Sequence, residues 1–476
     1  MKIPRQEEFG LMDSRVKAFF QSLPGKRVAF LGIGVTNTGI IKLFAQKGAQ
    51  VTACDKRTRE QLGETAEKLA SLGVSLKLGP DYLKGIEADM IFRTPGMKFF
   101  LPELEEYRRQ GIAVTSEMEL FFELCPCRKI AVTGSDGKTT TTTILSEFLK
   151  AEGNTVHLGG NIGKALLPEI ESMNPQDFAV VELSSFQLIS MRQSPDIAVV
   201  TNVAPNHLDM HKDMQEYIDA KRNILLHQNA FSKTVLNADN EITRSFAQDV
   251  RGQAVWFSYR HPIEEGSFLD GEGYLCMAHH GEVSRVFHKS EIRIPGEHNV
   301  ENYLTAIAAA WGLVSPQTMA DVARQFGGVE HRIEFVREIG GAKWYNDSIA
   351  SSPTRTIAGL KSFSQKVILI AGGYDKKIPY EPLAPYVNRH VRTLILMGKT
   401  GPKIEQAVKA DPGFVQGNLE IRHASSMKEA VRIAYDLSGE GDIVTLSPAS
   451  ASFDLYPNFE VRGQHFKQLV RELPEK

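Results

Sequence analysis

The stretch Val132-Thr133-Gly134-Ser135-Asp136-Gly137-Lys138-Thr139-Thr140 carries the strongest local signal in the chain. An apolar run, Ile130–Val132, leads into a glycine-rich loop whose backbone N–H groups can surround phosphates. Lys138 supplies a positive charge for the β/γ end of a nucleotide, and a threonine hydroxyl can bind Mg²⁺. The first glycine stands three residues before Gly137 rather than five, so the motif is a shortened phosphate loop. The alternative is a capped helix start with a surface lysine.

Three polar residues further along the chain are candidates for metal binding or catalysis. Glu182 ends an apolar run, Val180-Val181, and His207 lies in the segment Asn206-His207-Leu208-Asp209. A carboxylate and an imidazole at strand ends near a phosphate loop can bind a second metal ion, although Mg²⁺ prefers oxygen ligands. Taken alone, His207 is better explained as a structural histidine, and the alternative for Lys221 is one of many solvated helix lysines.

Around this loop, short β-branched runs, glycine-rich turns and helical stretches alternate, which predicts an α/β protein with parallel sheets. We expect three domains, which are residues 1–125, 126–328 and 329–476. The predicted strands are Val28–Leu31, Val51–Ala53, Met90–Phe92, Ile130–Val132, Ala179–Leu183, Ile197–Val200, Val367–Ala371, Leu394–Met397 and Ile443–Leu446. Between Val200 and about Arg293 we expect an irregular, β-rich stretch. One apolar face at i, i+3 and i+4 predicts a helix from Val300 to Trp311.

The first block contains a weaker nucleotide-like signal. Gly32-Ile33-Gly34 follows a strand, and Asp55 comes about twenty residues later, as in a dinucleotide-binding turn. Position 37 is asparagine where that fingerprint has its third glycine. A dinucleotide site, a nucleotide-sugar site and a tight strand-helix turn therefore stay open. Thr94-Pro95-Gly96 is either a second loop at the same sheet edge or a plain turn.

The totals exclude several classes of protein. With 476 residues the chain is too long for one ordinary core, and a formal net charge of -2 gives no general attraction to nucleic acid or membrane. No apolar run approaches the roughly 18 residues that span a bilayer, and the N-terminus lacks the apolar core of a signal peptide. The four cysteines are few, and Cys125 and Cys127 form neither a CxxC pair nor a zinc knuckle, so we expect a cytoplasmic protein.

The whole chain resembles the Mur ligase family. The residues that carry the likeness occur in the family's order, and they are the loop Gly134–Thr140, Glu182, the Asn206–Asp209 segment, Lys221, Gly296-Glu297-His298-Asn299 with Asn302, and His331-Arg332. The resemblance implies a Rossmann-like N-terminal domain, a P-loop NTPase-like central domain and a Rossmann-like C-terminal domain.

The resemblance also implies roles for residues of the first two domains. Lys138, His207 and Lys221 are the expected catalytic residues, with His207 as a ligand or orienting group. The expected ATP site comprises Gly134, Gly137, Lys138, Thr139, Thr140, Asn299, Asn302, Arg332 and Asp347. Two Mg²⁺ ions are expected on Thr139, Glu182, His207 and Lys221. Lys221 matches a lysine that CO₂ carbamylates, which replaces a repulsive charge near Mg²⁺ by an attractive one. The expected UDP-sugar site comprises Gly34, Thr36, Asp55, Arg57, Gly96 and Asn161.

The C-terminal block is similar to the family member that adds D-glutamate. The similar segments are Gly372–Lys376, Ser447–Asp454 and Asn458–Gly463. By resemblance, Lys376, Ser452 and Phe459 hold the two carboxylates of glutamate with help from Ser351, since a cation and fixed donors suit a dicarboxylate.

The chain departs from the family pattern at four places. Ile349 stands where lysine is usual, and Ser351 replaces a threonine while keeping a hydroxyl. Asp136 stands where asparagine is common in the phosphate loop. Asn206 replaces an acidic residue before His207, with Met210 where arginine is common. These departures indicate a divergent branch.

The resemblance implies an ATP-dependent ligase that joins D-glutamate to UDP-N-acetylmuramoyl-L-alanine through an acyl phosphate, in cytoplasmic peptidoglycan precursor synthesis. The expected partners are these small molecules, ATP and Mg²⁺, without nucleic acid or membrane, and the expected state is a monomer. The alternatives are a sibling ligase that uses another amino acid such as L-glutamate, a folyl-polyglutamate-type enzyme, a nucleotide-binding regulator without catalysis, and a NAD-dependent dehydrogenase.

Overall fold

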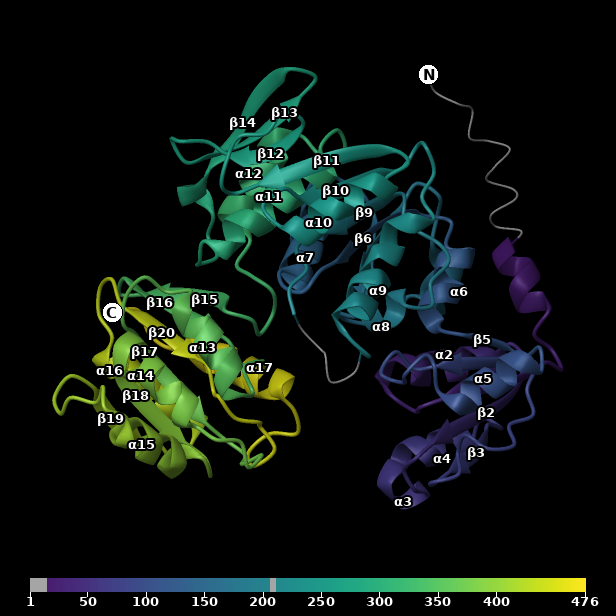
Figure 1. Cartoon of the computed structure of the whole chain (residues 1–476). Coiled ribbons are helices and arrows are strands. Elements are labelled where there is room, and N and C mark those ends of the chain that lie inside the picture. Colours follow the sequence, from purple (N-terminus) through teal and green to yellow (C-terminus); the bar gives the residue numbers. More distant parts are fainter. Residues whose placement is uncertain (1–14, 206–210) are drawn as a thin grey trace. The chain divides into compact units, whose positions relative to one another are not determined.

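A computed structural model describes residues 15–205 and 211–476 of the chain (Figure 1). The chain divides into two compact units. One runs to Phe287 and takes in Glu301–Val322, and the other comprises His288–Val300 and Ala323–Lys476. Each unit is described by itself below. Among the described residues, none of the helices combines the length and the apolar character that a membrane span requires.

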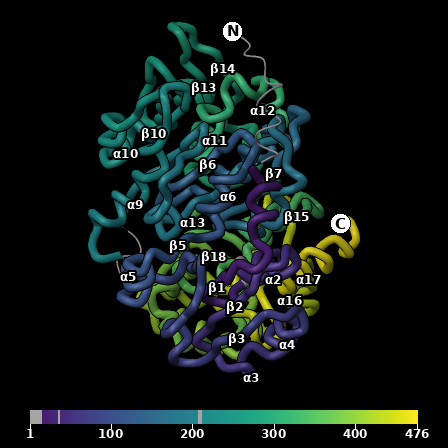
Figure 2. Tube along the Cα trace, turned by 90° about the vertical axis from the view of Figure 1, so that its right-hand side faces the viewer, coloured from purple at the N-terminus to yellow at the C-terminus, as the bar shows by residue number. Residues whose placement is uncertain are grey.

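The first sheet is a five-stranded parallel sheet in the order β3-β2-β1-β4-β5. Its strands are β1 (Arg27–Leu31), β2 (Gln50–Asp55), β3 (Ser75–Leu78), β4 (Met90–Arg93) and β5 (Ala113–Thr115). Its helices are α2 (Val35–Gln46), α3 (Arg59–Leu62), α4 (Glu64–Ala70), α5 (Pro102–Arg109) and α6 (Glu117–Leu124). Figures 1 and 2 show α2 and α4 beside the strands β2 and β3, against which they pack.

The central strand β1 is apolar from Val28 to Leu31 because helices cover both faces of a parallel sheet. Four of its five residues are buried. The ring of Phe30 stacks on that of Phe92 with 4.8 Å between centroids and meets Phe44 edge-on at 5.4 Å. These contacts hold β1, β4 and α2 together and so fix where their adjoining loops begin.

The second sheet has nine strands in the order β14-β13-β12-β11-β10-β9-β6-β8-β7. The strands are β6 (Arg128–Thr133), β7 (Val156–Gly160), β8 (Phe178–Glu182), β9 (Ile197–Val200), β10 (Lys233–Asn237), β11 (Gln253–Ser258), β12 (Gly266–Leu269), β13 (Tyr274–His279) and β14 (Glu282–His288). The helices are α7 (Lys138–Ala151), η1 (Leu167–Ser172), α8 (Ser185–Leu188), α9 (Met214–Leu226), α10 (Glu241–Ser245), η2 (Phe246–Asp249), η3 (Lys289–Glu291), α11 (His298–Ala310) and α12 (Pro316–Gln325). The strands from β7 to β12 run parallel, and β13 is antiparallel to β12.

The third sheet has six strands in the order β15-β16-β20-β17-β18-β19, parallel except for the edge strand β15. The strands are β15 (Glu334–Ile339), β16 (Ala342–Asn346), β17 (Val367–Gly372), β18 (Val391–Met397), β19 (Glu420–His423) and β20 (Ile443–Leu446). The helices are α13 (Pro353–Lys361), η4 (Glu381–Leu383), α14 (Ala384–His390), α15 (Gly401–Ala410), α16 (Met427–Leu437) and α17 (Phe459–Arg471).

The α/β class with three sheets is confirmed, and every predicted strand is present within two or three residues of its predicted ends. The β-rich stretch after Val200 is also confirmed, as β10 to β14. The predicted helix ends at Ala310, one residue short of Trp311. The domain boundaries at 125/126 and 328/329 stay predictions.

Candidate active site

The phosphate loop Gly134–Gly137 joins β6 to α7 at the carboxyl edge of the second sheet. Gly134 has φ +151°, and a Cβ added there would overlap the hydroxyl oxygen of Thr201. Gly137 has φ +77°, and a Cβ there would crowd the side-chain oxygen of Asn302. The chain therefore needs glycine at both positions, and the first turn of α7 is left facing the loop, as an anion site requires.

The side chains around the loop hold its backbone in place. The ammonium of Lys138 donates a 2.9 Å hydrogen bond to the carbonyl oxygen of Ser135. The Thr201 hydroxyl donates to the carbonyl oxygen of Asp136 at 2.6 Å, and the Asp136 N–H donates to the Asn202 side chain at 3.0 Å. Asp136 itself is exposed, so its carboxylate lies in solvent rather than inside the loop.

The Glu182 carboxylate forms hydrogen bonds with two side chains beside the loop, those of Thr139 and Asn161. Its strand β8 pairs with β6, with Val132 opposite Glu182. One carboxylate oxygen accepts a 2.7 Å hydrogen bond from the Thr139 hydroxyl, and the other accepts a 2.6 Å bond from the Asn161 amide. Asn161, which was predicted with the UDP-sugar residues, thus lies in the second sheet's site beside Glu182.

Lys221 is buried against the loop, with 1% of its surface exposed. Its ammonium donates a 2.6 Å hydrogen bond to the Gly134 carbonyl oxygen and lies 4.7 Å from the centre of the Tyr217 ring. Burial lowers the pKa of Lys221 well below 10.5, and the positive charge of Lys138 lowers it further, against an opposite effect of Glu182. The interpretation of Lys221 as a solvated helix lysine is therefore wrong.

The structure does not describe the side chains of two predicted residues. His207 lies outside the described residues, as does the side chain of Thr36. Asn206 and Met210, the departures beside His207, also lie outside them.

Sequence patterns did not single out Tyr217, which connects α9 to the loop, or His211, which connects α8 to α9. The Tyr217 hydroxyl and the Ser135 hydroxyl form a 2.9 Å hydrogen bond. The His211 ring pairs with the Ser185 hydroxyl at 2.8 Å and with the Glu216 carboxylate at 3.0 Å. The positions of His211 and Tyr217 just before Lys221 were the available signal, but only the tertiary contacts show which side chains they meet.

The first sheet brings its candidate residues to one edge. Asp55 ends β2 and accepts hydrogen bonds from the Ile33 N–H at 2.7 Å and from the Arg57 guanidinium at 2.8–2.9 Å. Burial by itself would raise the pKa of Asp55, but the bonds from Arg57 and Ile33 outweigh it and lower that pKa to about 2. The Asn37 amide donates to the Gly32 carbonyl oxygen at 2.9 Å, so asparagine closes this turn where a dinucleotide fingerprint has glycine.

The loop after β4 lies beside the same turn. A Cβ on Gly32 would stand 3.1 Å from the Thr94 side chain, and the Thr94 N–H donates to the Leu31 carbonyl oxygen at 3.1 Å. Gly96 is exposed on this loop. The Thr94-Pro95-Gly96 loop therefore lies at the same sheet edge as the Gly32–Gly34 turn, and its role in binding stays a prediction.

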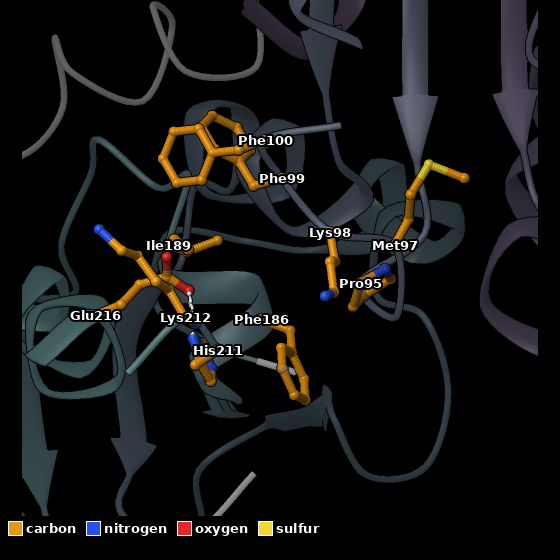
Figure 3. Close-up of a pocket in the computed structure, with 10 residues that line it drawn as sticks. All are labelled: Pro95, Met97, Lys98, Phe99, Phe100, Phe186, Ile189, His211, Lys212 and Glu216. Carbon is orange, nitrogen blue, oxygen red and sulfur yellow. Dashed lines mark hydrogen bonds and ion pairs between the residues drawn. The ribbon is translucent and has the colours of Figure 1, made fainter. Parts of the chain in front are cut away.

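A cavity of about 620 Å³ opens between this loop and the helices α8 and α9 (Figure 3). Phe99 and Phe100 lie on one side of it, and Phe186 and His211 lie on the opposite side (Figure 3). The remaining lining residues are Pro95, Met97, Lys98, Ile189, Lys212 and Glu216. The His211 and Phe186 rings are stacked at 5.0 Å, so the hydrogen bonds of His211 also fix one wall of the cavity.

A buried arginine fixes the two sides of this cavity relative to each other. Arg93, the last residue of β4, donates to the Ser190 hydroxyl at 2.7 Å and to the Phe186 carbonyl oxygen at 3.0 Å. Burial lowers the pKa of Arg93. Arg93 therefore holds the strand that leads into Pro95–Phe100 against the segment that carries Phe186.

In the other unit, Asp347 follows β16 and is buried. It accepts a 2.7 Å hydrogen bond from the Ser447 hydroxyl and a 3.3 Å bond from the Ile333 N–H. Burial raises the pKa of Asp347 to about 7, against the opposing effects of those bonds and of Arg332. Arg332 is exposed beside it, and Asn299 donates to the Pro295 carbonyl oxygen at 2.6 Å.

The candidate glutamate residues follow the carboxyl ends of β16, β17 and β20, which are neighbours in the third sheet. The Tyr374 N–H donates to the Ala451 carbonyl oxygen at 2.8 Å, which joins the Gly372–Lys376 loop to the segment that holds Ser452. Ser452 is buried, Lys376 is exposed, and Phe459 begins α17 and is half-buried. Ser351 lies after β16 with its N–H donated to the Ile349 carbonyl oxygen at 2.7 Å.

Arg462, which the sequence did not mark as a site residue, connects these loops. Its guanidinium donates to the Ser348 carbonyl oxygen at 2.8 Å and to the Ser450 carbonyl oxygen at 3.0 Å. The Ser348 hydroxyl in turn donates to the Phe459 carbonyl oxygen at 2.8 Å. Burial lowers the pKa of Arg462 to about 10. A single buried side chain thus sets the relative positions of the loops that carry Ser351, Ser452 and Phe459.

Three family models match consecutive segments of the chain. The Mur ligase MurD-like N-terminal domain matches residues 26–116, the Mur ligase middle domain matches 132–310, and the Mur ligase glutamate ligase domain matches 331–450. The UDP-N-acetylmuramoylalanine--D-glutamate ligase of Acetivibrio thermocellus is 49% identical over 466 residues, which cover 97% of this chain and 100% of that protein. The chain belongs to the Mur ligase family.

Other relatives agree with this assignment. The ligase of the same name from Ruminiclostridium cellulolyticum is 48% identical over 97% of this chain and 100% of its own length. Among solved structures, the UDP-N-acetylmuramate-alanine ligase MurC of Thermotoga maritima has a TM-score of 0.56 at 18% identity, with 94% of this chain and 99% of that chain covered. A pseudomurein peptide ligase type C from Methanothermus fervidus has a TM-score of 0.51 at 18% identity, with 94% and 100% covered. These two structures support the Mur ligase fold.

Family membership excludes the dehydrogenase alternative and confirms the predicted folds of the three domains. The NAD-dependent dehydrogenase is wrong for this chain, and the Gly32–Gly34 turn belongs to a MurD-like N-terminal domain. The Rossmann-like first and third domains and the central phosphate-loop domain, predicted by resemblance, are confirmed.

Proposed function

We propose that this chain is an ATP-dependent ligase that adds D-glutamate to UDP-N-acetylmuramoyl-L-alanine. The observation that carries the proposal is the group around the phosphate loop, where Lys138, Glu182 and the buried Lys221 converge in a chain whose full-length relatives bear that enzyme's name. We also propose a cytoplasmic monomer that binds small molecules and neither nucleic acid nor membrane, in keeping with its net charge of -2.

The proposed chemistry has two steps. The free carboxylate of UDP-N-acetylmuramoyl-L-alanine attacks the γ-phosphorus of ATP, which gives an acyl phosphate and releases ADP. The amine of D-glutamate then attacks the acyl carbon, and inorganic phosphate leaves from the tetrahedral intermediate. The N-terminus of α7 and Lys138 offset negative charge on the phosphates while the first step proceeds.

The residues beside the loop fit Mg²⁺, which the family uses with ATP, provided that Lys221 is modified. Glu182 and the Thr139 hydroxyl supply the oxygen donors that Mg²⁺ prefers. Bound Mg²⁺ would offset charge on the transferred phosphoryl group. An ammonium at Lys221 would repel the ion, whereas its carbamate would attract it. Its lowered pKa supports carbamylation, because only the neutral amine reacts with CO₂.

The UDP-linked substrate is proposed to lie along the first sheet's edge and through the cavity. Gly34, Thr36, Asp55, Arg57 and Gly96 belong to that edge, where exposed backbone N–H groups and a guanidinium suit a diphosphate. The cavity adjoins the same Gly96 loop, and its aromatic walls suit the less polar lactoyl and alanyl parts. Asn161 beside Glu182 is placed to orient the reacting end of the substrate.

Glutamate is proposed to bind at the carboxyl edge of the third sheet, with Lys376 and Ser452 on its carboxylates. Phe459 is the first residue of α17, so its N–H is among those left unpaired by the helix and can donate to a carboxylate. Ser351 supports the same site. Arg332 and Asp347 are proposed to contact ATP from this domain, together with Asn299 and Asn302 near the adenine.

The test is phosphate release from the purified chain with ATP, Mg²⁺ and UDP-N-acetylmuramoyl-L-alanine, with D-glutamate, L-glutamate or other amino acids as acceptor. We expect release that depends on D-glutamate. Preference for another amino acid would assign the chain to a sibling ligase, and no release with any amine would contradict ligase activity. Lys150→Ala, on the exposed face of α7, is the matched control for loss of activity in Lys138→Ala.

A further inference from the structure

A group of metal-binding side chains lies away from the phosphate loop. The Cys127 sulfur, a ring nitrogen of His157 and a carboxylate oxygen of Asp177 all lie within 4.8 Å of one another. His157 Nε2 and the Asp177 carboxylate form a 2.9 Å hydrogen bond. Cys125 stands two residues before Cys127 in the same connection. Both cysteines are buried.

The four residues come from three segments that are distant in sequence. Cys125 and Cys127 occupy the connection between α6, which ends at Leu124, and β6, which begins at Arg128. His157 is the second residue of β7, and Asp177 immediately precedes β8. Since β6, β8 and β7 are parallel neighbours with Arg128 and Val156 both opposite Phe178, all four residues lie at the amino edge of the sheet. The phosphate loop lies at the carboxyl edge of the same strands.

We propose that Cys125, Cys127, His157 and Asp177 bind one Zn²⁺ ion at this amino edge. Two thiolates, an imidazole and a carboxylate are ligands that zinc binds in tetrahedral sites. The donor atoms of Cys127, His157 and Asp177 are close enough that small side-chain shifts bring them to zinc-binding distance, and Cys125 is proposed as the fourth ligand because it lies two residues from Cys127. Each thiol loses its proton when its sulfur binds the metal, so binding one ion at two thiols releases up to two protons to solvent.

The site is chemically distinct from the one beside the phosphate loop. Glu182 and Thr139 offer oxygen donors to a hard cation, whereas the amino-edge group offers sulfur and nitrogen to a softer one. The ion would link the segment between α6 and β6 to the amino ends of β7 and β8. Its effect is therefore on the stability of that connection, and the proposal does not depend on the ligase activity.

The experiment uses the full chain, freed of metal with a chelator under reducing conditions and then titrated with Co²⁺ in excess Mg²⁺. We expect one Co²⁺ per chain with a thiolate-to-cobalt charge-transfer absorption, displaced by one equivalent of Zn²⁺. Only a site with thiolate ligands gives this absorption, so neither the phosphate-loop site nor the Glu265, His279 and His280 group produces it.

Variants assign the ligands. Cys127→Ser and His157→Gln should each weaken Zn²⁺ binding by at least about tenfold. Cys54→Ser, which removes another buried thiol on β2, should leave it unchanged. Absence of the charge-transfer band in the unaltered chain would overturn the proposal without recourse to variants. A band that survives in both Cys127→Ser and His157→Gln would overturn it as well.

Discussion

The side-chain nitrogen of Lys221 lies 2.6 Å from the carbonyl oxygen of Gly134, so a buried lysine on α9 contacts the first residue of the phosphate loop. Gly134 has a backbone conformation that favours glycine and is closely packed against Thr201. Lys221 cannot move away without leaving a buried carbonyl group unpaired. A chemical change at this lysine therefore directly alters the contacts of the loop that is proposed to bind ATP.

Lys221→Ala should lower kcat by on the order of 100-fold, because it removes the group proposed to offset positive charge of the metal and orient the loop. A short carboxylic acid such as acetate should restore part of the activity by occupying the space of the carbamate. The measurement is phosphate release with and without acetate.

Lys233→Ala is the control for this rescue. Lys233 is another largely buried lysine, and burial lowers its pKa to about 8, but it donates to the Trp311 carbonyl oxygen. Acetate should have no effect on that variant. Equal rescue of both variants, or rescue of neither, would contradict carbamylation at Lys221.

Lys138→Ala should abolish ADP formation, with a loss on the order of 100-fold or more, since a cation beside the transferred phosphoryl group is removed. Its hydrogen bond to Ser135 also orders the loop, so the variant's nucleotide affinity should be measured together with ADP release. Normal ADP formation would remove the phosphate loop from the proposed mechanism.

Ser452→Ala should raise the KM for glutamate by roughly tenfold and the KM for ATP much less, because one hydrogen bond to a charged carboxylate is lost. Ser450→Ala is the matched control, since the Ser450 hydroxyl is bonded to Tyr380 and Thr400 at 2.8 Å. Steady-state kinetics with each substrate varied distinguishes them. An equal rise in both KM values for Ser452→Ala would place this serine outside the glutamate site.

Lys98→Gln should raise the KM for UDP-N-acetylmuramoyl-L-alanine about two- to fivefold, because an exposed cation near an anionic substrate contributes modestly. Lys98 lines the cavity, whereas Lys68 is an exposed lysine on α4 paired with Glu64. Lys68→Gln should leave this KM unchanged. If Lys98→Gln alters only the KM for ATP, the cavity does not hold the UDP-linked substrate.

Asp347 makes the stability of its unit depend on pH. Its folded-state pKa of about 7 exceeds the ordinary value of 3.8, so between those values the folded chain holds a proton that the unfolded chain has released. Stability should therefore fall as pH rises from about 4 to about 7 and change no further above that range. The contribution to the slope is about 1.4 kcal/mol per pH unit near pH 5.5.

Asp347→Asn should remove this component from urea unfolding measured between pH 5 and pH 6.5, as expected for a group that titrates near 7. Asp375→Asn is the control, since Asp375 is half-buried at the surface and its hydrogen bond with Lys403 lowers its pKa. An unchanged slope in Asp347→Asn would show that Asp347 is already ionised in the folded chain.

Local patterns predicted the features that depend on neighbouring residues. The apolar run before Gly134, the glycines themselves and Lys138 belong to one strand-loop-helix unit, so their spacing alone indicates a phosphate loop. The runs Val28–Leu31 and Ile130–Val132 are apolar because both faces of a parallel sheet are covered, and this signal does not require knowledge of the partner strands.

Features that depend on strand order could not be predicted in this way. The sequence suggested a surface position for Lys221 as readily as a buried one, and only the packing of α9 on β6 decides it. Arg93 and Arg462 look like ordinary surface arginines in sequence, yet each is buried with carbonyl groups from distant loops.

The sequence by itself determined an α/β chain with a phosphate loop, and its resemblance to the Mur ligases indicated the three domains and the residues of the site. Tertiary structure alone decided what surrounds Cys125 and Cys127, whose spacing predicted neither a redox pair nor a zinc knuckle. The order β6-β8-β7 brings Asp177 and His157 to these thiols from 50 and 30 residues away. Hydrogen bonding between parallel strands sets that order, and a sequence records which residues favour strands but not which strands pair.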